Sequence, residues 1–190
     1  MNRFILEETP KECAQSHCDK HIVKMPTEEA QMLSTVHRVL DGTETRRQSA
    51  SGKTMAKYWV LEDERELDLY KAVHYRHPCT LWAMETLGNY RWAYALFGEL
   101  CEEYTFRYGK EHGAWTRLGE VLCRAPDSIP KILDVTPMPL AMKANPECIN
   151  HSDVIGSYRH FYATKKERFS LTWKNREQPV WWDHYAEMVG

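Results

Sequence analysis

The feature that most constrains the fold is a run of aromatic and aliphatic residues at helical spacing between Tyr90 and Tyr108. Its members recur every three or four residues and so share one helix face: Tyr90, Ala93, Tyr94, Phe97, Leu100, Cys101, Tyr104 and Tyr108. Gly109 follows as a stop signal. The stripe predicts a helix whose apolar face lies in the core. One or two rings near its ends could instead stack on nucleic-acid bases.

Helical signals also occur on both sides of this stripe. The best-defined one is Thr9-Pro10-Lys11-Glu12, because Thr9 can cap a helix, Pro10 suits its first position and Glu12 can reach back to the cap. Behind Pro26, apolar residues repeat at helical spacing until Gly42, which predicts two helices or one helix bent at Pro26. Similar spacing predicts helices over residues 61–74, 79–87, 115–122 and 152–168.

Three segments lack this spacing. Residues 43–56 are polar and are predicted to form a mobile loop; Gly52-Lys53-Thr54 is not a phosphate-binding loop, because Arg47 stands where that motif needs a glycine. Residues 125–151 hold five prolines, which predicts a long irregular segment. Residues 171–190 form an aromatic tail that should pack back over the body. The expected fold class is therefore mainly α: a single-domain helical bundle over residues 1–190, with a Pro-rich irregular segment and an aromatic C-terminal tail.

Composition excludes several classes of protein. Hydrophobic residues make up 43% of the 190 residues, enough for a packed globule, and no apolar run approaches the roughly 20 residues that span a bilayer. The net charge of −2 argues against a general duplex-DNA binder, which neutralises phosphates with Lys and Arg. Six cysteines without a C-x-x-C pair or a secretion signal predict free thiols in a cytoplasmic protein.

The candidate functional residues lie in the stretch from Cys13 to Arg38. On one helix, His17, His21 and Lys24 would share a face, because they lie three or four residues apart. With His37 and Arg38 they could form an anion or base pocket with Tyr or Trp walls. A second basic run, between residues 156 and 176, could also meet an anion: Arg159, Lys165, Lys166, Arg168, Lys174 and Arg176 stand there against Glu167 alone.

Two other chemistries remain open for the first stretch. His17 and His21 have the spacing by which a helix presents two imidazoles to one metal ion, with Asp19, His37, His74 or His77 as candidate third ligands. Cys18 could act as a nucleophile beside either histidine, although neighbouring residues on a helix point in different directions. The pocket for an anion or a base demands least of the geometry, so no metal and no cofactor are predicted.

Several motifs resemble small phage-encoded proteins that are grouped with the pyrimidine-dimer DNA glycosylases, and together they cover most of the chain: His17-Cys-Asp-Lys-His-Ile-Val-Lys-Met25, Gln31-Met-Leu-Ser-Thr-Val-His-Arg38, Tyr75-Arg-His-Pro78, Asn89-Tyr-Arg-Trp92, Glu103-Tyr-Thr-Phe-Arg-Tyr-Gly-Lys110 and Trp173-Lys-Asn-Arg176. The resemblance implies a compact all-α fold and base excision on damaged or modified DNA. In that family the N-terminal α-amine is the nucleophile and a first-helix glutamate is the essential acid. When His17 and Pro26 are matched to the family, the position of that glutamate falls at Lys24.

The sequence thus predicts a protein that recognises DNA or a nucleotide in the cytoplasm of an infected cell. The expected catalytic face is His17, His21 and Lys24, and further ligand or phosphate contacts are expected from His37, Arg38, His77, Arg107, Lys110, Arg159 and Lys165. The leading version is DNA glycosylase or lyase chemistry. The alternative is a non-catalytic protein that sequesters a small phosphorylated nucleotide, such as an immune second messenger. A virion or interaction protein, and a homo-oligomer, remain open.

Overall fold

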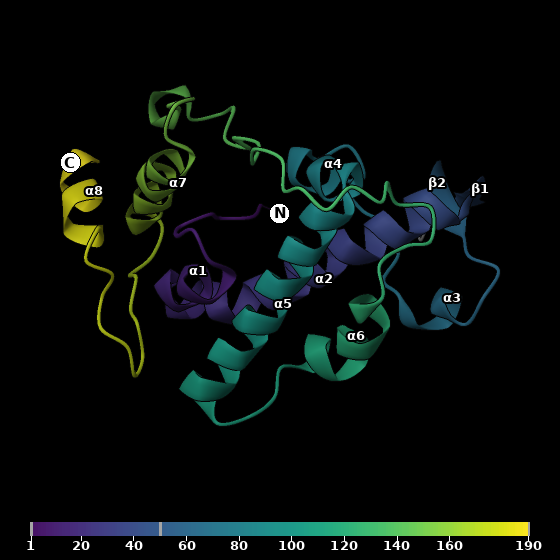
Figure 1. The fold of residues 1–190 in the computed structure, drawn as a ribbon, viewed down its shortest axis with the longest axis horizontal. Helices are drawn as coiled ribbons and strands as arrows, with labels where there is room; N and C mark the ends of the chain where they lie inside the picture. Colours follow the sequence, from purple (N-terminus) through teal and green to yellow (C-terminus); the bar gives the residue numbers. More distant parts are fainter. Residues whose placement is uncertain (1, 50, 190) are drawn as a thin grey trace.

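A computed structural model, which describes residues 2–49 and 51–189, folds mainly into α-helices with one small antiparallel sheet (Figure 1). This confirms the predicted mainly helical class. The helices and strands, in chain order, are α1 (Pro10–Ser16), α2 (Asp19–Asp41), β1 (Thr43–Gln48), β2 (Met55–Val60), α3 (Arg65–Asp68), α4 (Pro78–Glu85), α5 (Leu87–Tyr108), α6 (Gly113–Cys123), α7 (Val154–Ala163) and α8 (Trp182–Met188). Two short 3-10 turns cover Pro146–Cys148 and Thr164–Glu167.

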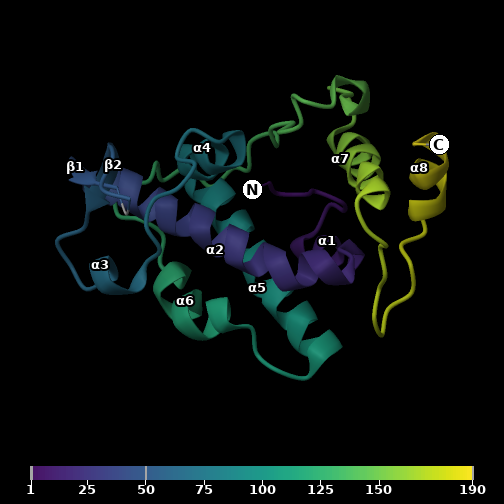
Figure 2. The same cartoon turned by 180° about the vertical axis from the view of Figure 1, so that it is seen from behind.

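Helices α2 and α5 cross at the centre of the molecule, and α1, α4 and α6 pack against them (Figures 1 and 2). The β1–β2 hairpin lies at one end of the long axis, and α7 and α8 lie at the other. The core has two parts. In one part, Ala93 and Phe97 of the α5 stripe pack with Leu33 of α2. In the other, Phe4 of the N-terminal arm packs with Tyr162 of α7.

Helix α5 follows its sequence signals closely. Phe97 and Ala93 are fully buried, so the middle of the stripe is core. Gly109 takes φ +69°, the left-handed conformation in which glycine carries no steric penalty, and ends the helix. At the other end, Thr86 caps the helix by accepting from the N–H of Asn89.

The first helical stretch is divided at a different place from the one predicted. Thr9 caps α1 as expected, accepting the N–H of Glu12 at 3.2 Å. The helix then ends at His17 and Cys18, whose ψ angles of 138° and 164° are extended, and α2 begins at Asp19. Pro26 lies inside α2, which continues through it to Asp41. The predicted helix boundary at Pro26 is therefore not found: one helix runs through it, and the break lies instead at His17 and Cys18.

The predicted mobile loop over residues 43–56 is for the most part a β-hairpin. Thr45 of β1 faces Tyr58 of β2, and Thr43 faces Val60, in an antiparallel register. The pairing was missed because β1 is polar and shows no alternation. Its support comes from across the sheet: the guanidinium of Arg47 lies 4.0 Å from the Tyr58 ring centroid, and Lys57 forms an ion pair with Glu44 at 2.7 Å.

Two other predicted helices are shorter than expected. Only Arg65–Asp68 is helical within 61–74, because the backbone carbonyls of Leu69 and Tyr70 turn inward to accept from the buried Arg38 side chain. The helix expected to reach residue 168 ends at Ala163 and continues as a 3-10 turn.

Residues 125–145 form no helix or strand and cross the start of α5, where Pro130 and Ile132 accept from the first backbone N–H groups of that helix. After α7, the chain runs back along the body. The indole N–H of Trp173 donates to the carbonyl of Ser16 at 3.0 Å, and Trp181 and Trp182 are largely buried against the N-terminal core. All six cysteines are free thiols, as predicted. Within residues 2–49 and 51–189, no helix has the length and apolarity that a membrane crossing requires.

Candidate functional site

His17 is buried at the end of α1, away from solvent. Its Nδ1 lies 2.7 Å from the carbonyl oxygen of Cys13, and because a carbonyl only accepts, Nδ1 carries the proton. Its Nε2 is buried and has no hydrogen-bond partner among the described residues. Burial, reinforced by the nearby charge of Arg107, lowers the pKa of His17 to about 4. The ring is therefore neutral at pH 7 and lacks access to a ligand in solution.

His21 lies beside it, on the first turn of α2. Its Nδ1 is 2.6 Å from the hydroxyl of Tyr162, which also accepts the N–H of Cys18 at 2.8 Å, and its ring stacks on Phe4 at 5.0 Å. Burial lowers the pKa of His21 to about 3, and the charges of Lys24 and Lys165 act in the same direction. The His21 ring is therefore neutral at pH 7 and lies near two cations, Lys24 and Lys165.

Those two cations belong to a cluster of cations and aromatic rings, which we call the basic face. It joins the first turns of α2 to the 3-10 turn after α7 and consists of Lys20, Lys24, Lys165 and Arg168 with the half-buried rings of Phe161 and Phe169. The ammonium of Lys165 lies 3.6 Å from the Phe161 ring centroid, and that of Lys20 lies 4.5 Å from Phe169. Phe169 in turn meets His21 edge-on at 5.6 Å.

The charges of the basic face repel one another. The pKa of Lys165 is lowered, first by burial and then by the charge of Arg168, with a smaller contribution from Lys24. Arg168 is exposed, and its guanidinium has no hydrogen-bond or ion-pair partner in the described part of the chain. An anion placed among these groups would relieve the repulsion and use the free donors of Arg168.

Two carboxylates border this face: Glu167, whose charge acts on Lys165, and Glu28. Glu28 pairs with Lys24 at 2.9 Å and also accepts the backbone N–H of Asn2 at 3.3 Å, so it joins α2 to the N-terminal arm. The Lys24 side chain is 59% exposed. The Glu28 side chain is only 13% exposed, so this pair is stronger than a fully exposed one, but the exposed ammonium of Lys24 is still within reach of a phosphate.

His37 lies far from the basic face. It is sixteen residues beyond His21 on the same helix, which corresponds to about 24 Å along the axis. Its Nδ1 accepts from Arg65 at 3.0 Å, and its Nε2–H donates to the hydroxyl of Tyr90 at 2.7 Å, which donates to the carbonyl of Leu122. Burial, followed by the charge of Arg65, lowers the pKa of His37 to about 4.

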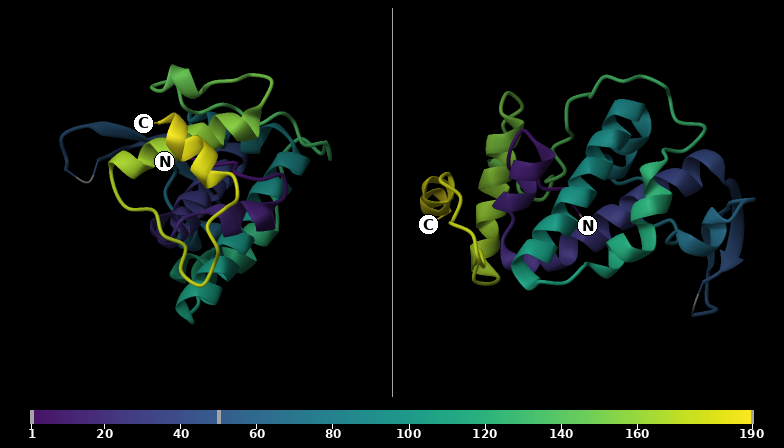
Figure 3. Two further views of the ribbon diagram at one scale, coloured as in Figure 1. Left: turned by 90° about the vertical axis from the view of Figure 1, so that its left-hand side faces the viewer. Right: turned by 60° about the horizontal axis from the view of Figure 1, so that its bottom comes forward.

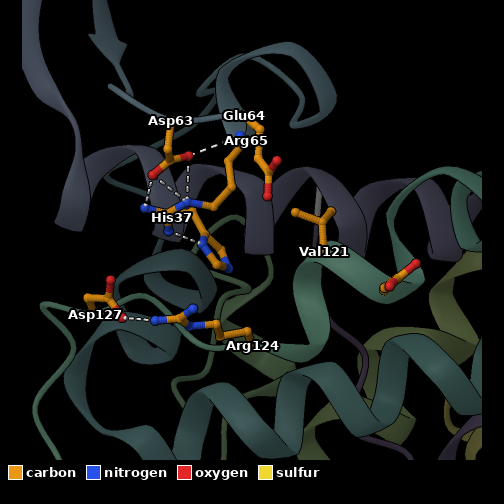
Figure 4. Close-up of a pocket in the computed structure, with 8 residues that line it drawn as sticks. His37, Asp63, Glu64, Arg65, Val121, Arg124 and Asp127 are labelled. Carbon is orange, nitrogen blue, oxygen red and sulfur yellow. Dashed lines mark hydrogen bonds and ion pairs between the residues drawn. The ribbon is translucent and has the colours of Figure 1, made fainter.

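The cavity beside His37 has a volume of about 470 Å³ (Figure 4). Arg65 and Asp63 lie above the ring, and the Arg124–Asp127 pair lies below it. The guanidinium of Arg65 is already neutralised by Asp41 and Asp63. In total the lining holds four carboxylates against two guanidinium groups: Asp63, Glu64, Glu120 and Asp127 against Arg65 and Arg124. The net negative lining disfavours a phosphate. Because His37 lies about 24 Å from His21 along α2, the expected pocket that joins His37 to His17, His21 and Lys24 is not formed.

Arg38 and Arg107 were expected to hold phosphate, but both are buried and serve the fold. The guanidinium of Arg38 donates to the carboxylate of Glu66 and to four backbone carbonyls. The guanidinium of Arg107 donates to Glu103 at 2.7 Å, to Asp19 at 2.9 Å and to the carbonyl of Gln15. Neither side chain has a donor turned to solvent.

The remaining expected cations are scattered. Arg159 holds α7 to the N-terminal arm by donating to the Leu6 carbonyl and to Glu7, whereas Lys110 is exposed beyond the end of α5. His77 caps α4 by accepting from the N–H of Cys79. Only Lys165 of this set joins Lys24 and His21.

The metal and thiol chemistries gain no support from the geometry. No group of three or more His, Cys, Asp or Glu residues within the described chain is arranged to hold a metal ion. Asp19, one candidate ligand, is occupied by Arg107, Thr172 and the backbone N–H of Lys174. Burial raises the pKa of Cys18, which opposes the thiolate that nucleophilic attack needs.

Comparisons of the chain with protein-family models, with curated proteins and with solved structures found no match. The basic face contains three residues that the sequence did not indicate as ligands: Lys20, Phe161 and Phe169. The signal for Arg168 was present in the basic run between residues 156 and 176. No pattern in the sequence places that run against the start of α2, since this contact joins residues more than 140 positions apart.

Proposed function

We propose that the protein binds a phosphate-bearing nucleic acid through the basic face, and that DNA with a damaged or modified base is its leading substrate. The observation that carries this proposal is the convergence of Lys24, Lys165 and Arg168 from two distant segments beside half-buried aromatic rings. Cations that track phosphates and rings that accept stacked bases are the usual elements of a single-strand or extruded-base site.

The energetics favour a ligand over the unbound face. A charge-assisted contact to phosphate is worth about 1.5–3 kcal/mol, which can offset the loss of the Lys24–Glu28 ion pair that it displaces. The burial of Lys165 strengthens any contact it makes, because water screens it less. The chain's overall charge of −2 disfavours binding over the surface in general, so the affinity should depend on local clusters of cations such as this face.

If the protein excises bases, Glu28 is the carboxylate best placed to assist. It borders the basic face through Lys24 and contacts the N-terminal arm through the N–H of Asn2. It lies one helical turn beyond Lys24, the position that the family resemblance gives to the essential acid. A carboxylate there could stabilise the positive charge that develops on the sugar as the bond to the base breaks. His17 and His21, neutral and buried, would position the arm and α2 without transferring protons.

Binding is tested first, with a fluorescent duplex carrying one lesion, the same duplex undamaged, and a panel of free nucleotides. We expect Lys24→Met to leave the fold intact and to weaken binding to the lesion duplex at least roughly tenfold, since it removes one charge-assisted contact. Lys24→Glu should bind more weakly still. Lys11→Met, which removes a charge from exposed α1, is the control and should bind like the wild type.

Excision is tested on the same duplex with Glu28→Gln. This variant should bind at least as tightly as the wild type, because a negative charge is removed, and should release the base at least roughly 100-fold more slowly. Glu12→Gln is the matched control, since within residues 2–49 and 51–189 the Glu12 carboxylate bonds to the Thr9 hydroxyl of the α1 cap and to no other group. Thermal stabilisation by free nucleotides, with no binding to any duplex, would overturn the DNA proposal and support nucleotide sequestration.

A further inference from the structure

The β1–β2 hairpin projects from the helical body and is exposed over most of its length (Figure 3). We propose that it is a second nucleic-acid contact, which enters a groove of the duplex that flanks the base bound at the basic face. This proposal rests on the proposed function for the identity of the partner. The hairpin itself shares no residue with the basic face.

The root of the hairpin is held firmly by the body. Trp59 is buried, its carbonyl accepts from Arg38, and the hydroxyl of Tyr58 donates to Glu66. Away from this root the strands contact little else. All of residues 46–48 and 51–57 are exposed, and the connecting turn is closed by the bonds Ser49–Thr54 and Gly52–Ser49. The structure therefore presents a fixed ribbon with a free tip.

The charge of this ribbon contrasts with that of the whole chain. Residues 43–60 carry four cations and one carboxylate in a protein of net charge −2: Arg46, Arg47, Lys53 and Lys57 against Glu44. Arg47 and Lys57 are partly engaged, by Tyr58 and by Glu44. The side chains of Arg46 and Lys53 have no hydrogen-bond or ion-pair partner among the described residues, so their charges are available to a polyanion.

The dimensions also suit a duplex groove. Six residues per strand extend about 20 Å, and the major groove of B-DNA, roughly 12 Å wide, admits a two-stranded ribbon. Exposed polar side chains at the tip, including Gln48 and Ser51, can reach phosphates or base edges. The exposed edges of the hairpin could also pair with another copy of the chain, although their charged side chains oppose this. Self-association is therefore the alternative that the experiment must distinguish.

The test compares the double variant Arg46→Gln/Lys53→Gln with the wild type on a 24-base-pair duplex carrying one lesion, over a range of salt concentrations. We expect roughly 100-fold weaker binding and a salt slope reduced by about 1.8, which corresponds to two lost phosphate contacts. The control Lys11→Gln/Arg91→Gln removes the same charge from exposed positions of α1 and α5 and should leave both values unchanged. Circular dichroism and thermal unfolding check the fold of each variant.

A single-stranded probe distinguishes the hairpin from the basic face. A lesion-bearing single strand has no groove, so the hairpin variant should bind it like the wild type, whereas basic-face variants should weaken both probes. Equal affinity of wild type and hairpin variant for the duplex, with weaker binding by Lys24→Met, would overturn the hairpin proposal alone. If neither the hairpin variant nor the basic-face variants bind nucleic acid more weakly than the wild type, the proposed function is overturned. A concentration-dependent dimer in sedimentation that the hairpin variant alone abolishes would identify the ribbon as a protein interface and also overturn the inference.

Discussion

Replacing Arg107 tests whether this cation stabilises the fold or binds a ligand. Arg107 is fully buried and its guanidinium joins the carboxylates of Glu103 and Asp19 to the Gln15 carbonyl. Arg107→Met keeps most of the side-chain volume but leaves these acceptors without their donor. Breaking a buried ion pair on one side costs about 3–5 kcal/mol.

The lower end of that range applies here. Glu103 keeps a two-bond contact with Arg176, and Asp19 keeps the Thr172 hydroxyl and the N–H of Lys174. We therefore expect a loss of about 3 kcal/mol, which for a chain of this size lowers Tm by roughly 6–12 °C.

The assay is urea and thermal unfolding followed by the fluorescence of the seven tryptophans, which include Trp173 where it packs at the end of α1. Lys110→Met is the matched control, since Lys110 is exposed three residues further along and loses the same charge. Its unfolding should match the wild type within about 0.5 kcal/mol. An Arg107→Met protein of wild-type stability that had lost nucleic-acid binding would refute the structural role and return Arg107 to the ligand site.

Three further predictions concern the core, the histidines and one glycine. Phe97→Ala should cost about 3–5 kcal/mol in urea unfolding because the ring is fully buried, while Tyr94→Phe should cost only about 1 kcal/mol, the bond from its hydroxyl to the Gly119 carbonyl. The pKa values of His17, His21 and His37 are lowered to about 4, 3 and 4, so as the pH falls these histidines take up protons in the unfolded chain before they do so in the folded one. The free energy of unfolding should therefore be highest above about pH 6.5 and fall continuously towards pH 4. A urea midpoint that stays constant over that range would contradict the burial of these rings. Gly109→Ala meets no neighbouring atom but must keep φ +69°, so it should lose about 1 kcal/mol, and unchanged thermal unfolding would show that the helix end rearranges freely.

Local signals in the sequence were sufficient for much of the helical framework. The α5 stripe, its Gly109 stop and the Thr9 cap each depend on residues within one or two turns, and each is found as predicted. Features that depend on distant residues were not predictable. The end of α1 at His17 is fixed partly by Trp173 and Tyr162, and the hairpin root by Arg38.

The candidate site shows the same division. Periodicity correctly placed His21 and Lys24 one turn apart on α2, but it treated His17 as part of the same helix and Arg38 as an exposed cation. Burial decided the roles of His17, Arg38 and Arg107, and burial depends on what packs over a residue from elsewhere in the chain. The basic face likewise needs the turn after α7 to lie against the start of α2, which no spacing within either segment encodes.

The most direct test of the basic face is the salt dependence of binding to the lesion-bearing duplex by the wild type and by Lys24→Gln/Arg168→Gln. Both side chains are exposed, so the fold should be unaffected. If they contact phosphates, the double variant should bind roughly 100-fold more weakly at about 0.1 M salt, and the slope of log affinity against log salt should become shallower by about 1.8. The same slope and the same affinity in both proteins would show that these cations contact no phosphate, and would contradict the basic face as the nucleic-acid site.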